Sequence, residues 1–102
     1  VWTEEVFGPA LAIVPFDTEE EALALAHDTD YGLSAFLYTK DGERVERLSR
    51  QLKAGSISTQ NSDYYKPQNA FGGYKASGIG RVGGVAGFHS VTLTKTCARA
   101  IG

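Results

Sequence analysis

Three short apolar runs alternate with two amphipathic stretches in the first 60 residues of the chain. The runs at residues 11–16, 34–39 and 56–59 have the length and composition of buried strands. Strands separated by helices of about a dozen residues usually pair in parallel, through right-handed crossovers. The pattern therefore predicts an α/β fold with a parallel β-α-β-α-β core over residues 11–60.

Polar residues and glycines predict where the two helices begin and end. Residues 17–21 start with oxygen-bearing side chains that are followed three residues on by glutamate, which is a capping-box signature. Asp41 is the expected cap of the second helix. Gly32 and Gly55 follow the two helices, and Gly32 is able to adopt a positive φ angle as the first helix ends.

The pattern changes from residue 61 onward. Residues 61–87 are polar, aromatic and rich in glycine, without a clean period. A loop of this length inside a domain is usually functional or disordered, and its aromatic residues argue against disorder. A short, poor helix is expected at 80–90, and the alternation from Val91 to Cys97 predicts a strand whose apolar face nothing local covers.

Composition excludes several classes of protein. With 102 residues the chain is one small domain, and its net charge of −2, with scattered basic residues, does not suggest a nucleic-acid partner. No apolar run approaches the roughly 20 residues of a membrane span. Cys97 is the only cysteine, which fits a reducing compartment, and we expect a cytoplasmic location. The absence of methionine predicts that the chain is a piece of a longer polypeptide.

Several residues with catalytic or binding chemistry have a simpler interpretation. Residues 78–83 read G-x-G-x-x-G, but a preceding strand, a following helix and a later acidic residue are all missing, so tight turns are favoured over a phosphate loop. Cys97 is expected to be a small packed hydrophobic residue. His27 and His89 are expected at the surface or at element ends, with no metal site. Lys66 is expected to be solvated.

The segment Glu4-Glu5-Val6-Phe7-Gly8-Pro9 leaves two interpretations open. A carboxylate and an aromatic ring two residues apart, stiffened by the following Gly-Pro pair, can accept both hydroxyls of a ribose and flank a flat ring. The same residues can equally form a simple turn that leads into the first strand.

The stretch "EEVFGP" resembles the Glu-x-Phe-Gly-Pro motif of the NAD(P)-dependent aldehyde dehydrogenase superfamily. The stretches "FDTEEEALALAHDTDYGLSAFLYTKD", "LKAGSIS" and "FGGYKASGIGR" resemble successive segments of the C-terminal catalytic region, in the same order. The resemblance implies a three-layer fragment with a long glycine- and aromatic-rich loop. Residues 1–90 would be the C-terminal portion of the catalytic domain, and residues 91–102 an oligomerisation strand and tail.

The resemblance also implies roles for individual residues. Glu5 would bind the nicotinamide ribose hydroxyls of NAD or NADP, and Phe7 would pack beside the nicotinamide. Residues 62–69 resemble the substrate-anchoring loop, and Tyr65 and Phe71 align with positions that line the aldehyde tunnel. The final strand, from Val91 to Cys97, would extend the sheet of a neighbouring subunit and make a homo-oligomer, with residues 78–83 in turns near that interface.

The family's catalytic cysteine, its base and its Rossmann-type cofactor domain correspond to positions before Val1, so no catalytic residue is expected in this chain. The parent enzyme would oxidise an aldehyde to a carboxylate through a cysteine thiohemiacetal, and the chain alone would be inactive. Two alternatives are a non-catalytic, self-associating module of the same fold and a reductase of acyl phosphates, against which Glu5 and Phe7 argue. The chain departs from the family pattern at Ala70, where Pro is usual, and at Val82, where Glu is usual.

Overall fold

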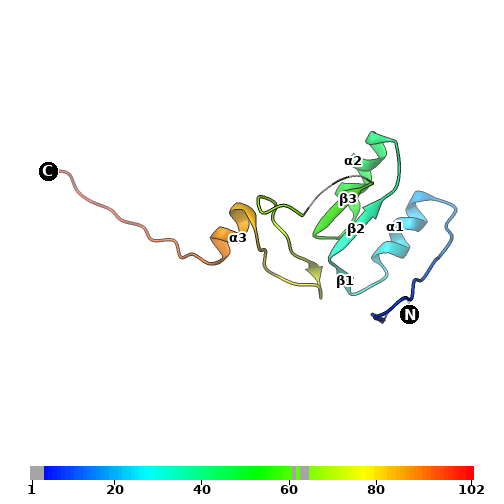
Figure 1. The fold of residues 1–102 in the computed structure, drawn as a ribbon. Helices are drawn as coiled ribbons and strands as arrows, with labels where there is room; N and C mark the ends of the chain where they lie inside the picture. Colours follow the sequence, from blue (N-terminus) through cyan, green and yellow to red (C-terminus); the bar gives the residue numbers. More distant parts are fainter. Residues whose placement is uncertain (1–3, 61, 63–64) are drawn as a thin grey trace.

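Residues 4–60, 62 and 65–102 are described by a computed structural model. In chain order the elements are α1 (Glu19–His27), β1 (Tyr31–Gly32), β2 (Ser34–Leu37), α2 (Gly42–Gln51), β3 (Ser56–Thr59), β4 (Tyr74–Lys75) and α3 (Gly84–Ser90). Elements α1, α2 and β1–β3 lie together and α3 stands apart, at the base of the C-terminal tail (Figure 1).

The strands form a parallel pair and an antiparallel pair. Strand β2 pairs in parallel with β3, from Ser34 opposite Ser56 to Leu37 opposite Thr59, and α2 is the connection between them. This confirms the predicted strand–helix–strand unit over that part of the chain. Strand β1 pairs antiparallel with β4, so the segment that follows α1 contacts the glycine-rich loop.

The helix starts were predicted correctly, and Gly32 has a different role from ending the first helix. The Thr18 hydroxyl accepts a hydrogen bond from the Glu21 N–H at 3.1 Å and caps α1, and Asp41 caps α2 through the Arg44 N–H at 3.1 Å. Gly32 does not adopt a positive φ angle. It lies in β1, where an added Cβ would stand 2.4 Å from the Lys53 carbonyl oxygen, so it is needed for close approach of two backbones.

The predicted first strand is absent from this chain. Residues 11–16 have no regular structure, and the side chains of Leu11 and Ile13 are 83% and 84% exposed. An apolar run becomes a strand only when a neighbouring strand supplies hydrogen bonds and cover, and no described residue does so here. The β-α-β-α-β core predicted over residues 11–60 is therefore reduced to its last two strands.

The glycine-rich loop contains more pairing than its composition suggested. Phe71 and Val82 form an antiparallel bridge in which each N–H donates to the other carbonyl at 2.8 Å. The Ser77 hydroxyl accepts a hydrogen bond from the Gly32 N–H at 3.0 Å and ties this loop to β1. The short helix expected near residues 80–90 is present as α3.

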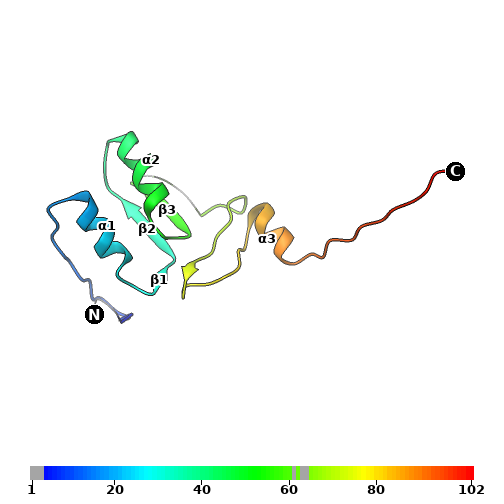
Figure 2. The ribbon, with the colours of Figure 1, turned by 180° about the vertical axis from the view of Figure 1, so that it is seen from behind.

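The last expected strand is also absent. Beyond α3 the chain runs out as an extended tail that leaves the rest of the molecule, as Figures 1 and 2 show from opposite sides. Leu93 is 98% exposed, and Cys97 is exposed rather than packed, which corrects the prediction for Cys97. The cause is the same as at residues 11–16, because no described segment lies beside the tail to pair with it. Pairing of residues 91–97 with a second copy of the chain stays a prediction.

No described hydrophobic side chain is fully buried, and the one buried polar residue among those described is Ser58 in β3. The molecule measures 71 × 32 × 24 Å, partly because of the tail. The apolar faces of its helices and strands are therefore open, and the three layers implied by the resemblance are not closed here. None of the described helices combines the length and apolar character that crossing a membrane requires.

Candidate functional site

Glu5 and Phe7 lie in an exposed segment that precedes α1. Phe7 is 86% exposed, and no described residue makes a hydrogen bond or ion pair with the Glu5 carboxylate. Gly8 has a φ angle of +112°, and its carbonyl accepts from the Ala10 N–H at 2.9 Å, so a tight turn follows the two side chains. No lysine or arginine of the described chain therefore neutralises the carboxylate, which can accept hydrogen bonds from a ligand.

Tyr65 and Phe71 are brought together at a second place. Their rings meet edge to face with centroids 5.9 Å apart. The backbone bridge between Phe71 and Val82 fixes the position of the Phe71 backbone. A cavity of about 280 Å³ opens beside the rings, and its lining residues are Tyr65, Lys66, Pro67, Asn69, Phe71, Val82 and Gly83.

The two predicted parts of the site are not adjacent in this chain. Figures 1 and 2 both place the N-terminal segment on the outer side of α1. The loop that carries Tyr65 and Phe71 lies beyond β1 and β2, toward α3. Neither the cofactor role of Glu5 and Phe7 nor the substrate role of Tyr65 and Phe71 is tested by this arrangement, and all four stay predictions.

The glycines of residues 78–83 act in turns. Gly83 has a φ angle of +72°, and a Cβ added there would stand 2.6 Å from the Asn69 carbonyl oxygen. The Arg81 guanidinium donates to the carbonyls of Gly73 and Gly80, each at 2.9 Å, and lies over the Tyr74 ring at 5.4 Å. Arginine and backbone contacts thus hold this segment together, in agreement with the predicted tight turns.

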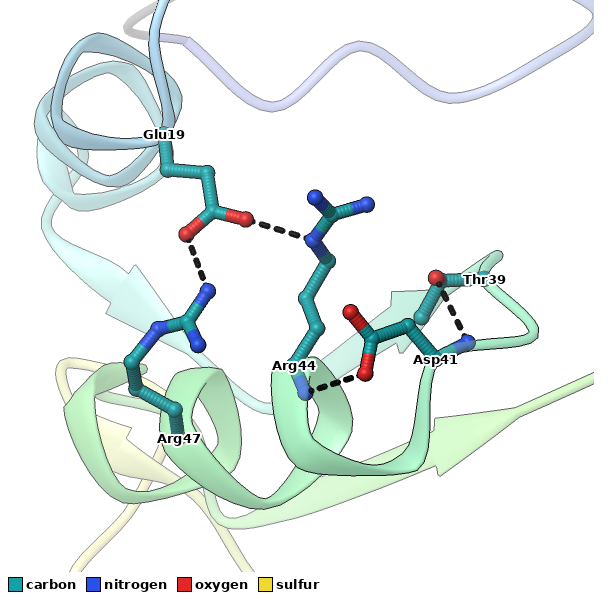
Figure 3. Close-up of polar contacts among 5 residues, drawn as sticks. All are labelled: Glu19, Thr39, Asp41, Arg44 and Arg47. Atoms are coloured by element: carbon teal, nitrogen blue, oxygen red, sulfur yellow. Dashed lines mark hydrogen bonds and ion pairs between the residues drawn. The ribbon is translucent and has the colours of Figure 1, made fainter.

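An ion-pair cluster between α1 and α2 was not predicted from the sequence (Figure 3). The Glu19 carboxylate contacts Arg44 Nε and Arg47 Nη2, each at 2.5 Å. The hydrogen bond from Arg47, with a smaller contribution from Arg44, holds the pKa of Glu19 below its usual value. Asp41 also has a lowered pKa, chiefly because its carboxylate accepts from the Arg44 backbone N–H.

The sequence offered no local signal for this cluster. Within its own helix, Glu19 is one of three acids that suit the dipole of the first helical turn. Its arginine partners are 25 and 28 residues away, on a separate helix. Contacts of that range depend on how the helices pack, which the spacing of residues within one helix does not specify.

A lysine fastens the glycine-rich loop to the end of α1. The Lys75 ammonium group donates to the carbonyls of His27 and Thr29 at 3.0 and 2.7 Å. The His27 Nε2 atom accepts from the Lys53 N–H at 3.2 Å, which agrees with the role expected for a histidine at a helix end. No group of His, Cys, Asp and Glu within the described ranges is arranged to hold a metal ion.

A wide apolar groove of about 570 Å³ runs between α1, β2 and α2. Leu23 of α1, Phe36 of β2 and Leu48 of α2 are among its lining residues. The groove carries no convergent set of polar groups apart from the ion-pair cluster at its rim, so it resembles an uncovered packing surface rather than a catalytic pocket.

The parallel strand–helix–strand unit places the chain among α/β proteins. Comparison with known proteins identifies the family, because the sequence profile of the aldehyde dehydrogenase family matches residues 1–97. This chain belongs to the aldehyde dehydrogenase family.

Individual relatives agree with this assignment. The chain is 49% identical over 81 residues to acetaldehyde dehydrogenase 2 of Cupriavidus necator. These aligned residues are 79% of the chain and 16% of that protein. It is 45% identical over 93 residues to the NADP/NAD-dependent aldehyde dehydrogenase PuuC of Escherichia coli, covering 91% of the chain and 19% of that protein. It therefore spans about a fifth of the length of these relatives.

Solved structures confirm the fold. The chain superposes on an apo betaine aldehyde dehydrogenase of Staphylococcus aureus with a TM-score of 0.85 and 40% identity, covering 91% of this chain and 19% of that one. A Mycobacterium tuberculosis aldehyde dehydrogenase complexed with NAD+ matches with a TM-score of 0.79 and 44% identity, covering 86% and 18%. The α/β fold of this chain is thus the fold of part of an aldehyde dehydrogenase.

Proposed function

We propose that this chain supplies nicotinamide-ribose and aldehyde contacts in an enzyme that oxidises an aldehyde to a carboxylate with NAD(P)+. The observation that carries the proposal is the exposed Glu5 carboxylate beside the exposed Phe7 ring, followed by the turn at Gly8. The Escherichia coli relative is NADP/NAD-dependent, and the Mycobacterium tuberculosis relative was solved with NAD+, which supports a nicotinamide cofactor.

The two side chains suit this role chemically. An ionised carboxylate offers two acceptor oxygens, so Glu5 can accept a hydrogen bond from each of two neighbouring ribose hydroxyls. The Phe7 ring can cover one side of a planar base and exclude water from it. The bound NAD(P)+ supplies the hydride acceptor, while Tyr65 and Phe71 line the approach of the aldehyde.

The 102 residues alone are proposed to be inactive. Oxidation in this family is expected to pass through a thiohemiacetal on an activated cysteine, which needs a base or cation to keep it ionised. Cys97 lies exposed in the tail, and no described acid or base contacts it. The nucleophile is therefore assigned to another part of the full-length natural protein, whose relatives are about five times longer than this chain.

Replacing Glu5 by glutamine in the full-length natural protein tests the cofactor contact. Glu5→Gln loses the charge and one acceptor oxygen, so we expect the KM and the dissociation constant for NAD(P)+ to rise about tenfold, as for a lost hydrogen bond to a charged group. The matched control is Glu4→Gln, which is exposed in the same segment. Equal cofactor affinity in the two variants would contradict the proposed role.

Self-association is the second function that a specific observation favours. Val91 and Leu93 are 82% and 98% exposed on an extended tail, a geometry suited to adding a strand to a second copy. This supports a homo-oligomer joined from Val91 to Cys97, with the boundary between domain and tail at residue 90. Leu93→Asp should shift the full-length protein to a smaller species in light scattering, whereas Thr92→Asp, at an alternate position, should have less effect.

A further inference from the structure

The cavity beside Tyr65 and Phe71 has an uneven charge. Lys66 is the one charged residue among its described lining residues, and the others are aromatic, aliphatic or neutral. Two rings in edge-to-face contact form an apolar wall. A positive group at an apolar cavity favours a ligand that joins an anionic end to a hydrocarbon segment.

The Lys66 ammonium group is not neutralised by any described residue. No ion pair or hydrogen bond joins it to the described ranges. Arg81, which precedes Val82 in the sequence, is different because its guanidinium already donates to the Gly73 and Gly80 carbonyls. Lys66 is therefore exposed, as predicted, and no described residue occupies its three donors, which can bind a ligand.

A second lining residue strengthens this preference for an anionic ligand. Val82 lines the cavity and pairs with Phe71 through the backbone. An acidic side chain there would attract Lys66 and repel an anionic ligand. With an aliphatic residue instead, no acidic side chain among the described lining residues compensates the positive charge of Lys66.

We propose that this cavity selects aldehydes that carry a carboxylate at the end remote from the carbonyl, with Lys66 as the specificity-determining residue. The inference rests on the proposed oxidation of an aldehyde by this enzyme. The Lys66 ammonium group donates to the substrate carboxylate, and the methylene chain packs against the Tyr65 and Phe71 rings. No bond of the substrate is made or broken at this position, because the group recognises the end that does not react.

The kinetic test compares two aldehydes of equal length, glutarate semialdehyde and pentanal, in the full-length natural protein. Lys66→Gln should lower kcat/KM for the semialdehyde about tenfold, as for a lost charge-assisted hydrogen bond, and leave pentanal within about twofold. Lys66→Arg should keep the preference, because the positive charge remains. Lys40→Gln, exposed at a distance from the cavity, is the matched control.

The outcomes separate this inference from the function on which it rests. Oxidation of both aldehydes with a ratio unaffected by Lys66→Gln overturns the inference and leaves the proposed function intact. Oxidation of neither aldehyde contradicts the proposed function instead. In that case, ligand-observed NMR compares the affinities of the cavity for pentanoate and pentanol. An unchanged pentanoate affinity in Lys66→Gln overturns the inference. A loss of at least fivefold, reduced at high salt, supports it.

Discussion

Gly55 occupies a position that admits no side chain. A Cβ added there would stand 1.7 Å from the Gly72 carbonyl oxygen, a distance at which two atoms overlap. The Gly55 N–H also donates to the Gly32 carbonyl at 3.0 Å, so the backbone cannot move away without losing that bond. The glycine-rich loop and β3 thus approach each other at one residue, and its size fixes their separation.

Gly55→Ala should therefore destabilise the full-length protein by about 3 kcal/mol or more, the upper range for inserting a methyl group into a closely packed place. The matched control is Gly42→Ala, at the first position of α2, where an added Cβ meets nothing within 4 Å. That change should instead stabilise the protein by roughly 0.4–1 kcal/mol by restricting the unfolded chain. Denaturant unfolding of both variants measures the two effects, and similar values would contradict the close approach.

At the residue scale the sequence predicted local motifs better than long-range partners. Glu5 and Phe7 could be identified because they belong to a short, local motif that the Gly-Pro pair stiffens. Both side chains are exposed, as binding of a ligand requires. The bonds from Lys75 to the end of α1 could not be predicted, since donor and acceptors are 46 and 48 residues apart. The cavity beside Lys66 likewise depends on a backbone bridge that no spacing indicates.

At the scale of elements, Glu19 joins two helices that the sequence presents as separate. Its carboxylate forms ion pairs with Arg44 and Arg47 of α2, and its side chain is 32% exposed. Water therefore weakens each pair, and the benefit depends on two arginines sharing one acid. Glu46 differs because it pairs only within α2, with Arg50, four residues on.

Glu19→Gln should lower the unfolding midpoint of the full-length protein more than Glu46→Gln and less than Gly55→Ala. The pKa of Glu19 is lowered in the folded state, so its contribution is complete above its ordinary pKa of 4.5 and is lost as the pH falls through the lowered value. The difference between wild type and Glu19→Gln should thus be present at neutral pH and shrink on acidification. Thermal unfolding across that range, repeated at high salt, measures it, and a difference that grows in acid would contradict the argument.

The elements that the sequence predicted correctly are those whose signals are local. Both helix caps, α2 and the parallel β2–β3 pair depend on residues within one strand–helix–strand unit. The two predicted strands that are absent, at residues 11–16 and 91–97, are apolar runs without a described neighbour. Periodicity predicts what a strand would bury, but the hydrogen bonds that make it a strand belong to its partner.

At the scale of the whole molecule, the apolar surface exceeds what a stable domain leaves in contact with water. The groove between α1, β2 and α2 is open, and Leu11, Ile13, Phe36 and Leu93 are each more than half exposed. Exposed apolar area of this extent marks surfaces that are normally covered by other protein. The relatives, about five times longer, have the additional chain that such cover requires.

The 102-residue chain produced alone should consequently show no cooperative unfolding transition. Ordering each backbone residue costs about 1–2 kcal/mol, and burial of apolar side chains is the main term that offsets this cost. No described hydrophobic side chain is fully buried, so that term is small. We expect a gradual denaturant profile, weak amide protection in hydrogen exchange and strong binding of an apolar dye. In the full-length protein the same amides in β2, α2 and β3 should be protected. A sharp transition with protected amides in the isolated chain would show that the strand–helix–strand unit is stable without cover.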